Sequence, residues 1–371
     1  MPSRIAVICA TNRRNTGMLT VDLAAEQFFQ HFPAEVTFFR SHVPDGKNEI
    51  RFAGQTFAAY RDSSQLADFD RIIFWGDFQN SLPYGRKNFA GLDRRYGPMS
   101  TPEESFARWR RLFLLEGYRR TPGQRVISVS NNFQGVGAAV DDLPAPVREE
   151  LADLYAHSFD RIFPRDPEST KDLLQFAPDA AAGRVSQGLD AAFLLDSRSY
   201  ASGTPSKVPY LRYFFGRSGF SGTGSLVAKA ALSLRALPGE MNDWFEVDPN
   251  CDGRAHVGKQ VERLTAARAV LTDTYHLCVN ALNLGIPAVG IGRPVARQIT
   301  AAGDFKKSVL FESLGLRDFY VDRAELDTEA RRTIVDALRA AAAKGPAWKN
   351  AFALLASSRE AYRKKLAEAI F

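Results

Sequence analysis

The first half of the chain alternates short apolar runs with segments of helical spacing. The apolar runs have the length of buried strands and occupy residues 5–10, 36–39, 71–75 and 125–129. Residues 19–29 and 146–157 have helical spacing, and residues 161–176 indicate a short strand followed by a capped helix. The order strand, helix, strand predicts an open, largely parallel α/β sheet.

Residues 201–207 interrupt this series with serine, glycine, proline and threonine, a composition that predicts a linker. A second series follows, with apolar strands at 210–215, 269–272 and 286–291 and helices at 225–237 and 276–284. Two long amphipathic helices follow at 327–343 and 348–370. Because 371 residues exceed one ordinary domain, we predict two α/β domains with a boundary between residues 197 and 208.

Composition and charge exclude several classes of protein. Hydrophobic residues make up 45% of the chain and charged residues 24%, which is typical of a globular protein. The net charge of +6 comes from basic residues spread along the sequence without a nucleic-acid-binding motif, so we do not expect nucleic acid as a partner. The sequence has no signal-peptide pattern and no apolar stretch near the ~20 residues of a membrane span. Its cysteines are far apart (Cys9, Cys251 and Cys278), so we expect a cytoplasmic protein with reduced thiols.

Polar side chains at the ends of predicted strands are the first candidates for a site, because parallel sheets bind ligands at the carboxyl ends of their strands. In the second domain, a buried strand ends in Thr272, Asp273 and Thr274, and His276 follows in the first turn of a helix. Free N–H groups and the helix dipole make such a turn an anion site. His276 would contact a phosphate or donate a proton there; alternatively, it packs against the sheet.

This stretch resembles the polysaccharide pyruvyl transferase family. Its members carry a Thr/Ser-Asp-Arg-Leu-His motif after a strand, then an alanine-rich helix and Gly-Ile-Pro; the matching residues here are Thr272, Asp273, His276, Ala281, Gly285, Ile286 and Pro287. Segments 163–174, 188–195 and 305–316 add weaker similarity. The resemblance implies two Rossmann-like domains facing a central cleft, as in GT-B glycosyltransferases. It also implies transfer of a pyruvyl group from phosphoenolpyruvate to a sugar of a bacterial glycan.

One position departs from the family motif. The family arginine two positions before the histidine is Thr274 here, and a threonine cannot replace a bidentate guanidinium that grips a carboxylate or phosphate. Either another cation takes that role, with Arg165, Arg217, Arg293 and Lys307 as candidates, or the donor has changed. A glycosyltransferase that uses a nucleotide sugar is therefore the alternative. A catalytically inactive sugar- or nucleotide-binding homologue is a third hypothesis.

These considerations give a set of expected donor contacts: Arg165, Arg217, Thr272, Asp273, Thr274, Lys307 and Gly17. Gly17 is included because a residue without a side chain lets the backbone approach a ligand closely. Arg165 is equally well explained by a surface ion pair with Asp166 or Glu168. We expect neither a metal ion nor a cofactor beyond the donor substrate itself.

The first domain supplies the expected acceptor side. Asp77 follows a strand and is a candidate base for an acceptor hydroxyl, although an aspartate at a strand end more often stabilises a turn. Residues 80–104 read as a long loop that would bind an acidic glycan or a lipid-linked pyrophosphate through its basic side chains, Arg86, Lys87, Arg94 and Arg95. A solvated loop is the alternative. A lipid-linked acceptor would bring the protein into peripheral contact with a membrane.

The expected organisation has three parts. Residues 1–200 form the acceptor-side domain and residues 201–345 the donor-side domain. Residues 346–371 form a final helix that packs back on the first domain.

Overall fold

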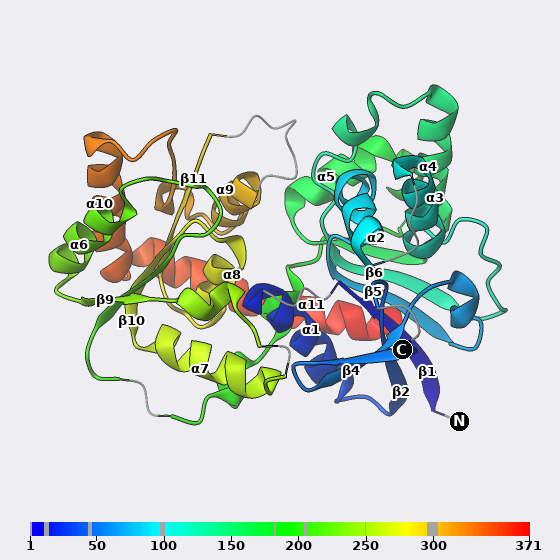
Figure 1. Ribbon diagram of the computed structural model, residues 1–371, viewed down its shortest axis with the longest axis horizontal. Helices are drawn as coiled ribbons and strands as arrows, with labels where there is room; N and C mark the ends of the chain where they lie inside the picture. The colour runs from blue at the N-terminus through cyan, green and yellow to red at the C-terminus, as the bar shows by residue number, and fades with distance from the viewer. Residues whose placement is uncertain are drawn as a thin grey trace. The chain divides into compact units, whose positions relative to one another are not determined.

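The computed structural model describes residues 2–10, 15–43, 47–96, 101–181, 183–203, 206–248, 250–294 and 303–371 (Figure 1). The chain forms two compact units. Unit 1 contains residues 1–12, 21–194 and 362–371, and unit 2 contains residues 13–20 and 195–361. The chain therefore changes unit near Leu194, a few residues before the predicted linker.

Unit 1 is built on a seven-stranded sheet in the order β3-β4-β2-β1-β5-β6-β7. Its strands are β1 (Ser3–Cys9), β2 (Ala34–Arg40), β3 (Glu49–Phe52), β4 (Gln55–Ala59), β5 (Arg71–Asp77), β6 (Arg125–Asn131) and β7 (Arg161–Pro164). All neighbouring strands are parallel except β3 and β4. Its helices are α1 (Thr16–Phe29), α2 (Ala90–Tyr96), α3 (Pro102–Phe113), α4 (Ala145–His157) and α5 (Pro167–Phe176). The first turn of α1, up to Thr20, belongs to unit 2.

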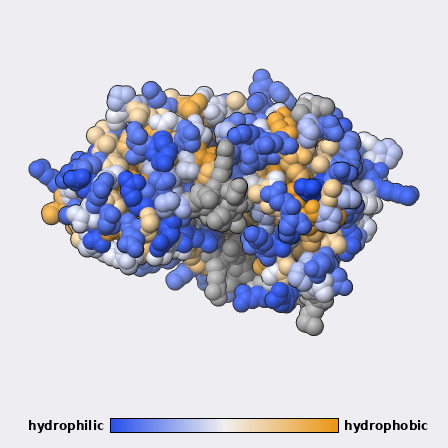
Figure 2. Space-filling view, turned by 90° about the horizontal axis from the view of Figure 1, so that it is seen from above, coloured by the Kyte–Doolittle hydropathy of each residue, from blue (hydrophilic) through white to orange (hydrophobic). Residues whose placement is uncertain are grey.

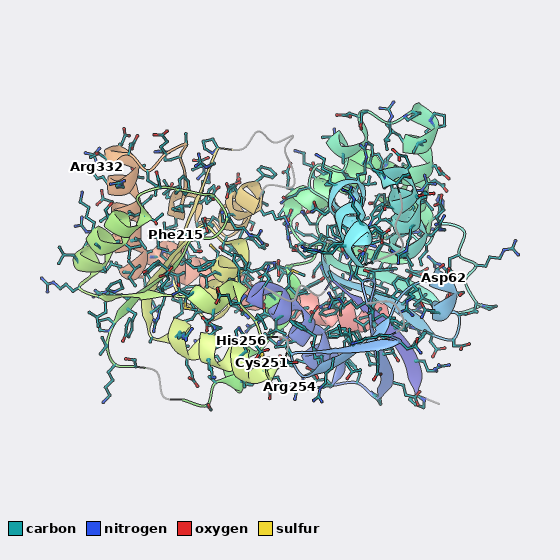
Figure 3. The ribbon with its side chains drawn as sticks, in the orientation of Figure 1. Asp62, Phe215, Cys251, Arg254, His256 and Arg332 are labelled. Carbon is teal, nitrogen blue, oxygen red and sulfur yellow. The ribbon has the colours of Figure 1, made fainter. Side chains whose placement is uncertain are left out.

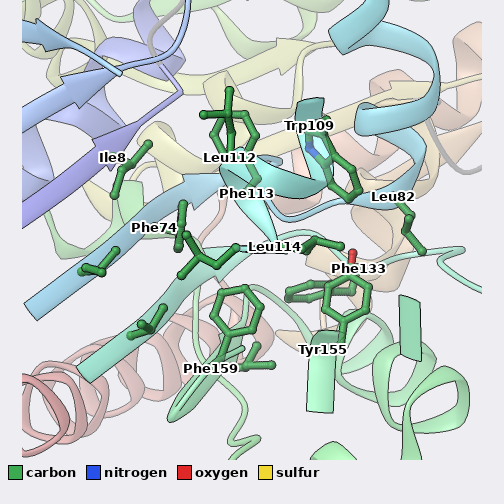
Figure 4. Close-up of a cluster of buried hydrophobic side chains, with 14 of the residues drawn as sticks. Ile8, Phe74, Leu82, Trp109, Leu112, Phe113, Leu114, Phe133, Tyr155 and Phe159 are labelled. Carbon is green, nitrogen blue, oxygen red and sulfur yellow. The ribbon is translucent and has the colours of Figure 1, made fainter. Parts of the chain in front are cut away.

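The core of unit 1 packs aromatic side chains against the central strands. Figure 4 shows Phe74, Trp109, Phe113 and Tyr155 in this cluster, and each has an exposed fraction of 1% or less. Each buried ring contributes on the order of 2–3 kcal/mol of hydrophobic free energy relative to exposure. The cluster joins β5 and β6 to α3 and α4, so it fixes the strand ends from which the polar side chains of unit 1 emerge.

Residues 80–104 are helical over most of their described length, so their prediction as a long loop is wrong. A wider, π-type helix at Tyr84–Phe89 runs directly into α2. Gly85 makes this possible, because a Cβ at this position would lie 2.3 Å from the ring of Trp109. Tyr84 and Phe89 are buried. The Gly, Pro and Arg content that indicated a loop therefore conceals an apolar face of helix.

Unit 2 is built on five parallel strands in the order β12-β11-β10-β8-β9. They are β8 (Tyr210–Phe214), β9 (Leu237–Glu240), β10 (Ala267–Thr272), β11 (Ala288–Gly292) and β12 (Tyr320–Asp322). The helices of this half are α6 (Thr223–Leu234), α7 (Gly253–Thr265), α8 (Tyr275–Asn283), α9 (Gly303–Ser313), α10 (Thr328–Ala342) and α11 (Pro346–Ile370). Helices α6 and α10 cover one face of the sheet, and α7, α8 and α9 cover the other (Figure 1).

The edge strand β9 pairs only with β8 in the described part of the chain. The N–H of Leu237 donates to the carbonyl of Pro209, just before β8, and the N–H of Met241 donates to the carbonyl of Tyr213 in β8, both at 2.9 Å. Because the backbone groups of successive residues in a strand point in alternate directions, those of Pro238 and Glu240 point away from β8, toward the open edge of the sheet.

The last turns of α11 belong to unit 1, which confirms the predicted return of the final helix to the first domain. Tyr362, Leu366 and Ile370 are buried at intervals of four residues, with exposed fractions of 2% or less. Within unit 1, Arg71 donates from Nε to the carbonyl of Ile370 at 2.7 Å, and Tyr362 shares a hydrogen bond with Ser130 at 3.0 Å.

The described helices include none with the length and hydropathy needed to cross a bilayer. Hydrophilic residues cover much of the face drawn in Figure 2, and hydrophobic residues occur there in scattered patches.

Candidate functional site

The carboxyl end of β10 organises the polar edge of the unit 2 sheet. Thr272 donates from Oγ1 to the carbonyl of Phe214 at 2.7 Å, which ties β10 to β8. The carboxylate of Asp273 accepts three backbone N–H groups of the β8–α6 loop, from Gly216, Arg217 and Ser218, at 2.7–2.9 Å. Asp273 therefore shapes the loop, and its negative charge is compensated within the protein.

A buried ion pair supports this edge from behind. Lys307, which is fully buried, donates from Nζ to Asp304 Oδ1 at 2.6 Å and also to the carbonyl of Asp273. Asp304 in turn accepts from the hydroxyl of Ser218 and the backbone N–H of Arg293, both at 3.0 Å. Charges this deep are stable only when they are paired and hydrogen-bonded. Lys307 thus holds α9 against the loop.

The first turn of α8 begins without a side-chain cap. Its N-cap, Thr274, makes no side-chain hydrogen bond to the helix, because Thr274 Oγ1 donates to Asp273 Oδ1 at 3.2 Å. The N–H groups of this turn and the dipole of the helix favour an anion. His276 lies in this turn and is 6% exposed. The place of the family arginine is therefore occupied by a buried, uncharged hydroxyl.

The β8–α6 loop brings a second helix start to the same sheet edge. Gly219 and Gly222 have φ angles of 61° and 70°, which favour glycine, and α6 begins after Gly222 without a side-chain cap. A Cβ on Gly222 would lie 2.6 Å from Nη2 of Arg331, so this guanidinium lies against the start of α6. Glycines before a helix start are a common way to bind phosphate groups.

Arg217 in this loop and Arg293 after β11 differ in their surroundings. Arg293 donates to the carbonyls of Ser218, Ala324 and Gly219 at 2.7–3.3 Å, so its guanidinium is used to hold the loop. Arg217 is exposed, and its guanidinium lies 4.8 Å from the ring centre of Phe245. Arg217 is consequently the better-placed of the two to meet a ligand from solvent.

The strand ends of unit 1 carry a second polar cluster. Arg165 is 2% exposed and pairs with Asp77, with Asp166 at 3.4 Å and with Asp190 at 4.0 Å. Asp166 also accepts from the backbone N–H of Ser169 at 2.7 Å, so it is the residue that caps α5. Arg165 is therefore a buried centre of three carboxylates, not one half of a surface ion pair.

Backbone strain accompanies this cluster. Asp77 and Ser130 have φ angles of 22° and 58° although neither is glycine, and they end β5 and lie near the end of β6. Such conformations gather at functional sites. They agree with the placement of a candidate base at Asp77, but the close ion pair with Arg165 occupies lone pairs that a base would need.

The expected site residues divide between the units. Unit 1 holds Asp77, Arg165, Arg86, Lys87, Arg94 and Arg95, and unit 2 holds Gly17, Arg217, Thr272, Asp273, Thr274, His276 and Lys307. Arg86 pairs with Asp142 through two hydrogen bonds of 2.5 and 2.9 Å, whereas the other three basic residues of its segment are exposed. Thr272, Asp273 and Lys307 act on one another and on the loop.

Three residues at the carboxyl end of the unit 2 sheet could not be predicted as part of the site from the sequence. Ser218, Asp304 and Arg331 come from three different elements, and only their shared position at the sheet edge connects them. The sequence does place Asn280 beside His276, because it lies four residues later on the same helical stripe.

Known proteins resemble this chain in fold. No family model matches the chain, and no curated protein sequence does. An α-glucosyltransferase solved with UDP and a 13-mer DNA containing a HMU base is 12% identical, with a TM-score of 0.51 and 100% of both chains covered. The UDP-GlcNAc 2-epimerase of Methanocaldococcus jannaschii is 11% identical, with a TM-score of 0.50, covering 98% of this chain and 99% of its own. These similarities confirm the predicted GT-B-like fold with two Rossmann-like domains.

Proposed function

We propose that this chain is a glycosyltransferase that uses a nucleotide-sugar donor. The observation that carries the proposal is the pair of helix starts, α8 and α6, that lie without side-chain caps at one edge of the unit 2 sheet. Two anion-favouring helix starts on neighbouring strands suit the two phosphates of a nucleoside diphosphate better than a single phosphate. The fold supports this choice, since both matched enzymes have UDP or a UDP-sugar in their names.

The residues of unit 2 have distinct roles in this proposal. The backbone N–H groups of the first turns of α8 and α6 bind the diphosphate, and exposed Arg217 offsets its negative charge. His276 hydrogen-bonds the phosphate next to the sugar and stabilises it as a leaving group. Asp273 and Lys307 contribute by holding the loop, so their effect on the donor is indirect.

Pyruvyl transfer from phosphoenolpyruvate is the second candidate, because the order Thr272, Asp273, His276 resembles that family's motif. Its weakness is the buried Thr274 hydroxyl, which supplies no charge where the family has arginine. Arg217 would then have to bind the carboxylate of the donor. The acceptor in either case is a saccharide or a lipid-linked saccharide.

Isothermal titration calorimetry with UDP, UDP-glucose and phosphoenolpyruvate separates the two candidates. We expect UDP and UDP-glucose to bind. Binding should also raise the free energy of unfolding, by about 2.7 kcal/mol for a ligand at a hundred times its Kd. Arg217→Ala should weaken UDP binding about tenfold, since a charge-assisted hydrogen bond is worth about 1.5–3 kcal/mol. Arg332→Ala is the matched control, an exposed arginine on α10 (Figure 3). Binding of phosphoenolpyruvate without binding of UDP would reject the nucleotide-sugar proposal.

A further inference from the structure

The first turn of α1 lies directly against His276. A Cβ placed on Gly17 would be 2.2 Å from Cβ and 2.6 Å from Cγ of His276. Contacts under 3 Å do not occur between real Cβ atoms, so only glycine allows this approach. The close approach that the sequence suggested for Gly17 is therefore made, in the structure, to a side chain of the protein.

Hydrogen bonds close a ring between this turn and α8. Thr20 donates from Oγ1 to the carbonyl of Gly17 at 2.7 Å and accepts from Asn280 Nδ2 at 3.2 Å. The same Nδ2 donates to the carbonyl of His276 at 2.8 Å. Gly17, Thr20, Asn280 and His276 thus form one connected unit across two helices.

Two further bonds fix the turn itself. Asn15 accepts the backbone N–H of Gly17 on Oδ1 at 2.9 Å. Thr16, which is fully buried, shares a hydrogen bond of 2.9 Å between its Oγ1 and Nε2 of His256 on α7 (Figure 3). Thr20 and Asn280 are also buried, at 1% and 4% exposure, so the bond between them is shielded from competition with water.

We infer that the first turn of α1, Thr16–Thr20, is a positioning element for His276. This inference rests on the proposed function, in which His276 contacts the donor phosphate. Gly17 limits where the imidazole can lie, and the Thr20–Asn280 bond ties this turn to α8 within unit 2. A catalytic group displaced by about 1 Å loses on the order of a hundredfold in rate, so modest loosening of this turn has a measurable effect.

The test compares Thr20→Val, which removes both hydroxyl bonds at nearly constant volume, with Thr20→Ser, which keeps them. Histidine is labelled with 13C, and the His276 resonance is identified by its loss in His276→Gln. We expect Thr20→Val to shift the ring resonances of His276 and to lower turnover about tenfold. Thr20→Ser should restore both, and Thr56→Val, at an exposed threonine of β4, should leave them unchanged.

Outcomes for this proposal and for the proposed function are separate. If Thr20→Val lowers the melting temperature but leaves the His276 resonances unchanged, the turn is only structural and the inference is overturned. If wild-type protein binds no UDP, the proposed function fails, while the His276 resonance still decides the positioning role. If Thr20→Val does not fold, the pair Thr16→Val and Thr16→Ser gives the same comparison at the His256 bond.

Discussion

At the scale of single residues, His276 carries the strongest prediction. In the proposed reaction it stabilises the departing phosphate from the first turn of α8, so His276→Ala should lower kcat by about a hundredfold or more. His276→Asn should recover part of the loss if the imidazole acts as a hydrogen-bond donor, and none if it transfers a proton. Release of UDP from the donor is the measurement. Near-normal turnover of His276→Ala would place the active site elsewhere.

One buried histidine, His42, and one half-buried histidine, His256, give a pH dependence. Burial lowers the pKa of His42 and of His256 below the usual value of 6.5, although Asp93 opposes the shift at His42. The unfolded chain then binds protons more readily than the folded chain, so the free energy of unfolding should fall as the pH drops below about 6.5. Urea denaturation at about pH 7.5 and 5.5 measures this fall.

The His42→Gln variant should reduce that fall, and His31→Gln, at an exposed position, serves as its control. An equal pH dependence in wild type and His42→Gln would show that His42 does not contribute to it.

The sequence was informative about residues only where local spacing determines their place. His276 follows a strand and opens a helix, so its position at the sheet edge could be predicted from the chain. The role of Lys307 could not, because it depends on Asp304 and on a carbonyl 34 positions away in the sequence. Arg165 shows the same limit, since Asp77 and Asp190 reach it only after the sheet has formed.

At the scale of elements, the π-type helix at Tyr84–Phe89 and the following α2 predict opposite effects on stability when a glycine in each is replaced by alanine. Gly85→Ala would place a methyl group 2.3 Å from the ring of Trp109, and such overpacking costs about 1–3 kcal/mol. Gly91→Ala in α2 meets no atom within 4 Å, so it should stabilise the helix by up to about 1 kcal/mol. Chemical denaturation of both variants checks the signs. A destabilising Gly91→Ala, or a neutral Gly85→Ala, would contradict the packing described for this segment.

Elements with a clear apolar period were predicted well, and those defined by turns were not. The central strands and α8 follow from runs of apolar residues. The hairpin of β3 and β4 was missed because its turn uses Ala53 and Gly54, with φ angles of 48° and 85°, in place of a more recognisable Asn-Gly pair. The π-type helix at Tyr84–Phe89 was missed because Gly85, which enables close packing against Trp109, cannot be told from a loop glycine in the sequence.

At the scale of the whole molecule, α11 links the stability of unit 1 to the end of the chain. Leu366 is fully buried in unit 1, so Leu366→Ala should cost about 2–5 kcal/mol. Leu354, on the same helix, is 47% exposed, and Leu354→Ala should change stability by about 0.5 kcal/mol or less. The free energy of unfolding of the two variants is the test. Equal effects would mean that the last turns of α11 do not stabilise unit 1.

The two-domain organisation could be predicted from the sequence, but the exact division could not. The change of unit near Leu194 lies close to the Ser, Gly, Pro and Thr segment that indicated the boundary. Residues 13–20 instead join unit 2 although they follow β1 of unit 1. That assignment depends on contacts such as Gly17 with His276, which no local pattern contains.

The outer edge of β9 has a consequence for the protein in a crowded solution. Leu237 of β9 is 53% exposed, so the edge strand carries an apolar side chain that strands of other molecules could contact. A strand of another molecule would add to this edge by hydrogen bonds to the outward backbone groups of Pro238 and Glu240. Pro238 has no N–H to donate, and the charge of Glu240 repels a like charge on an incoming strand. We therefore expect Pro238 to hinder amyloid-like strand addition, because it removes a backbone donor from the edge to which another strand would bind.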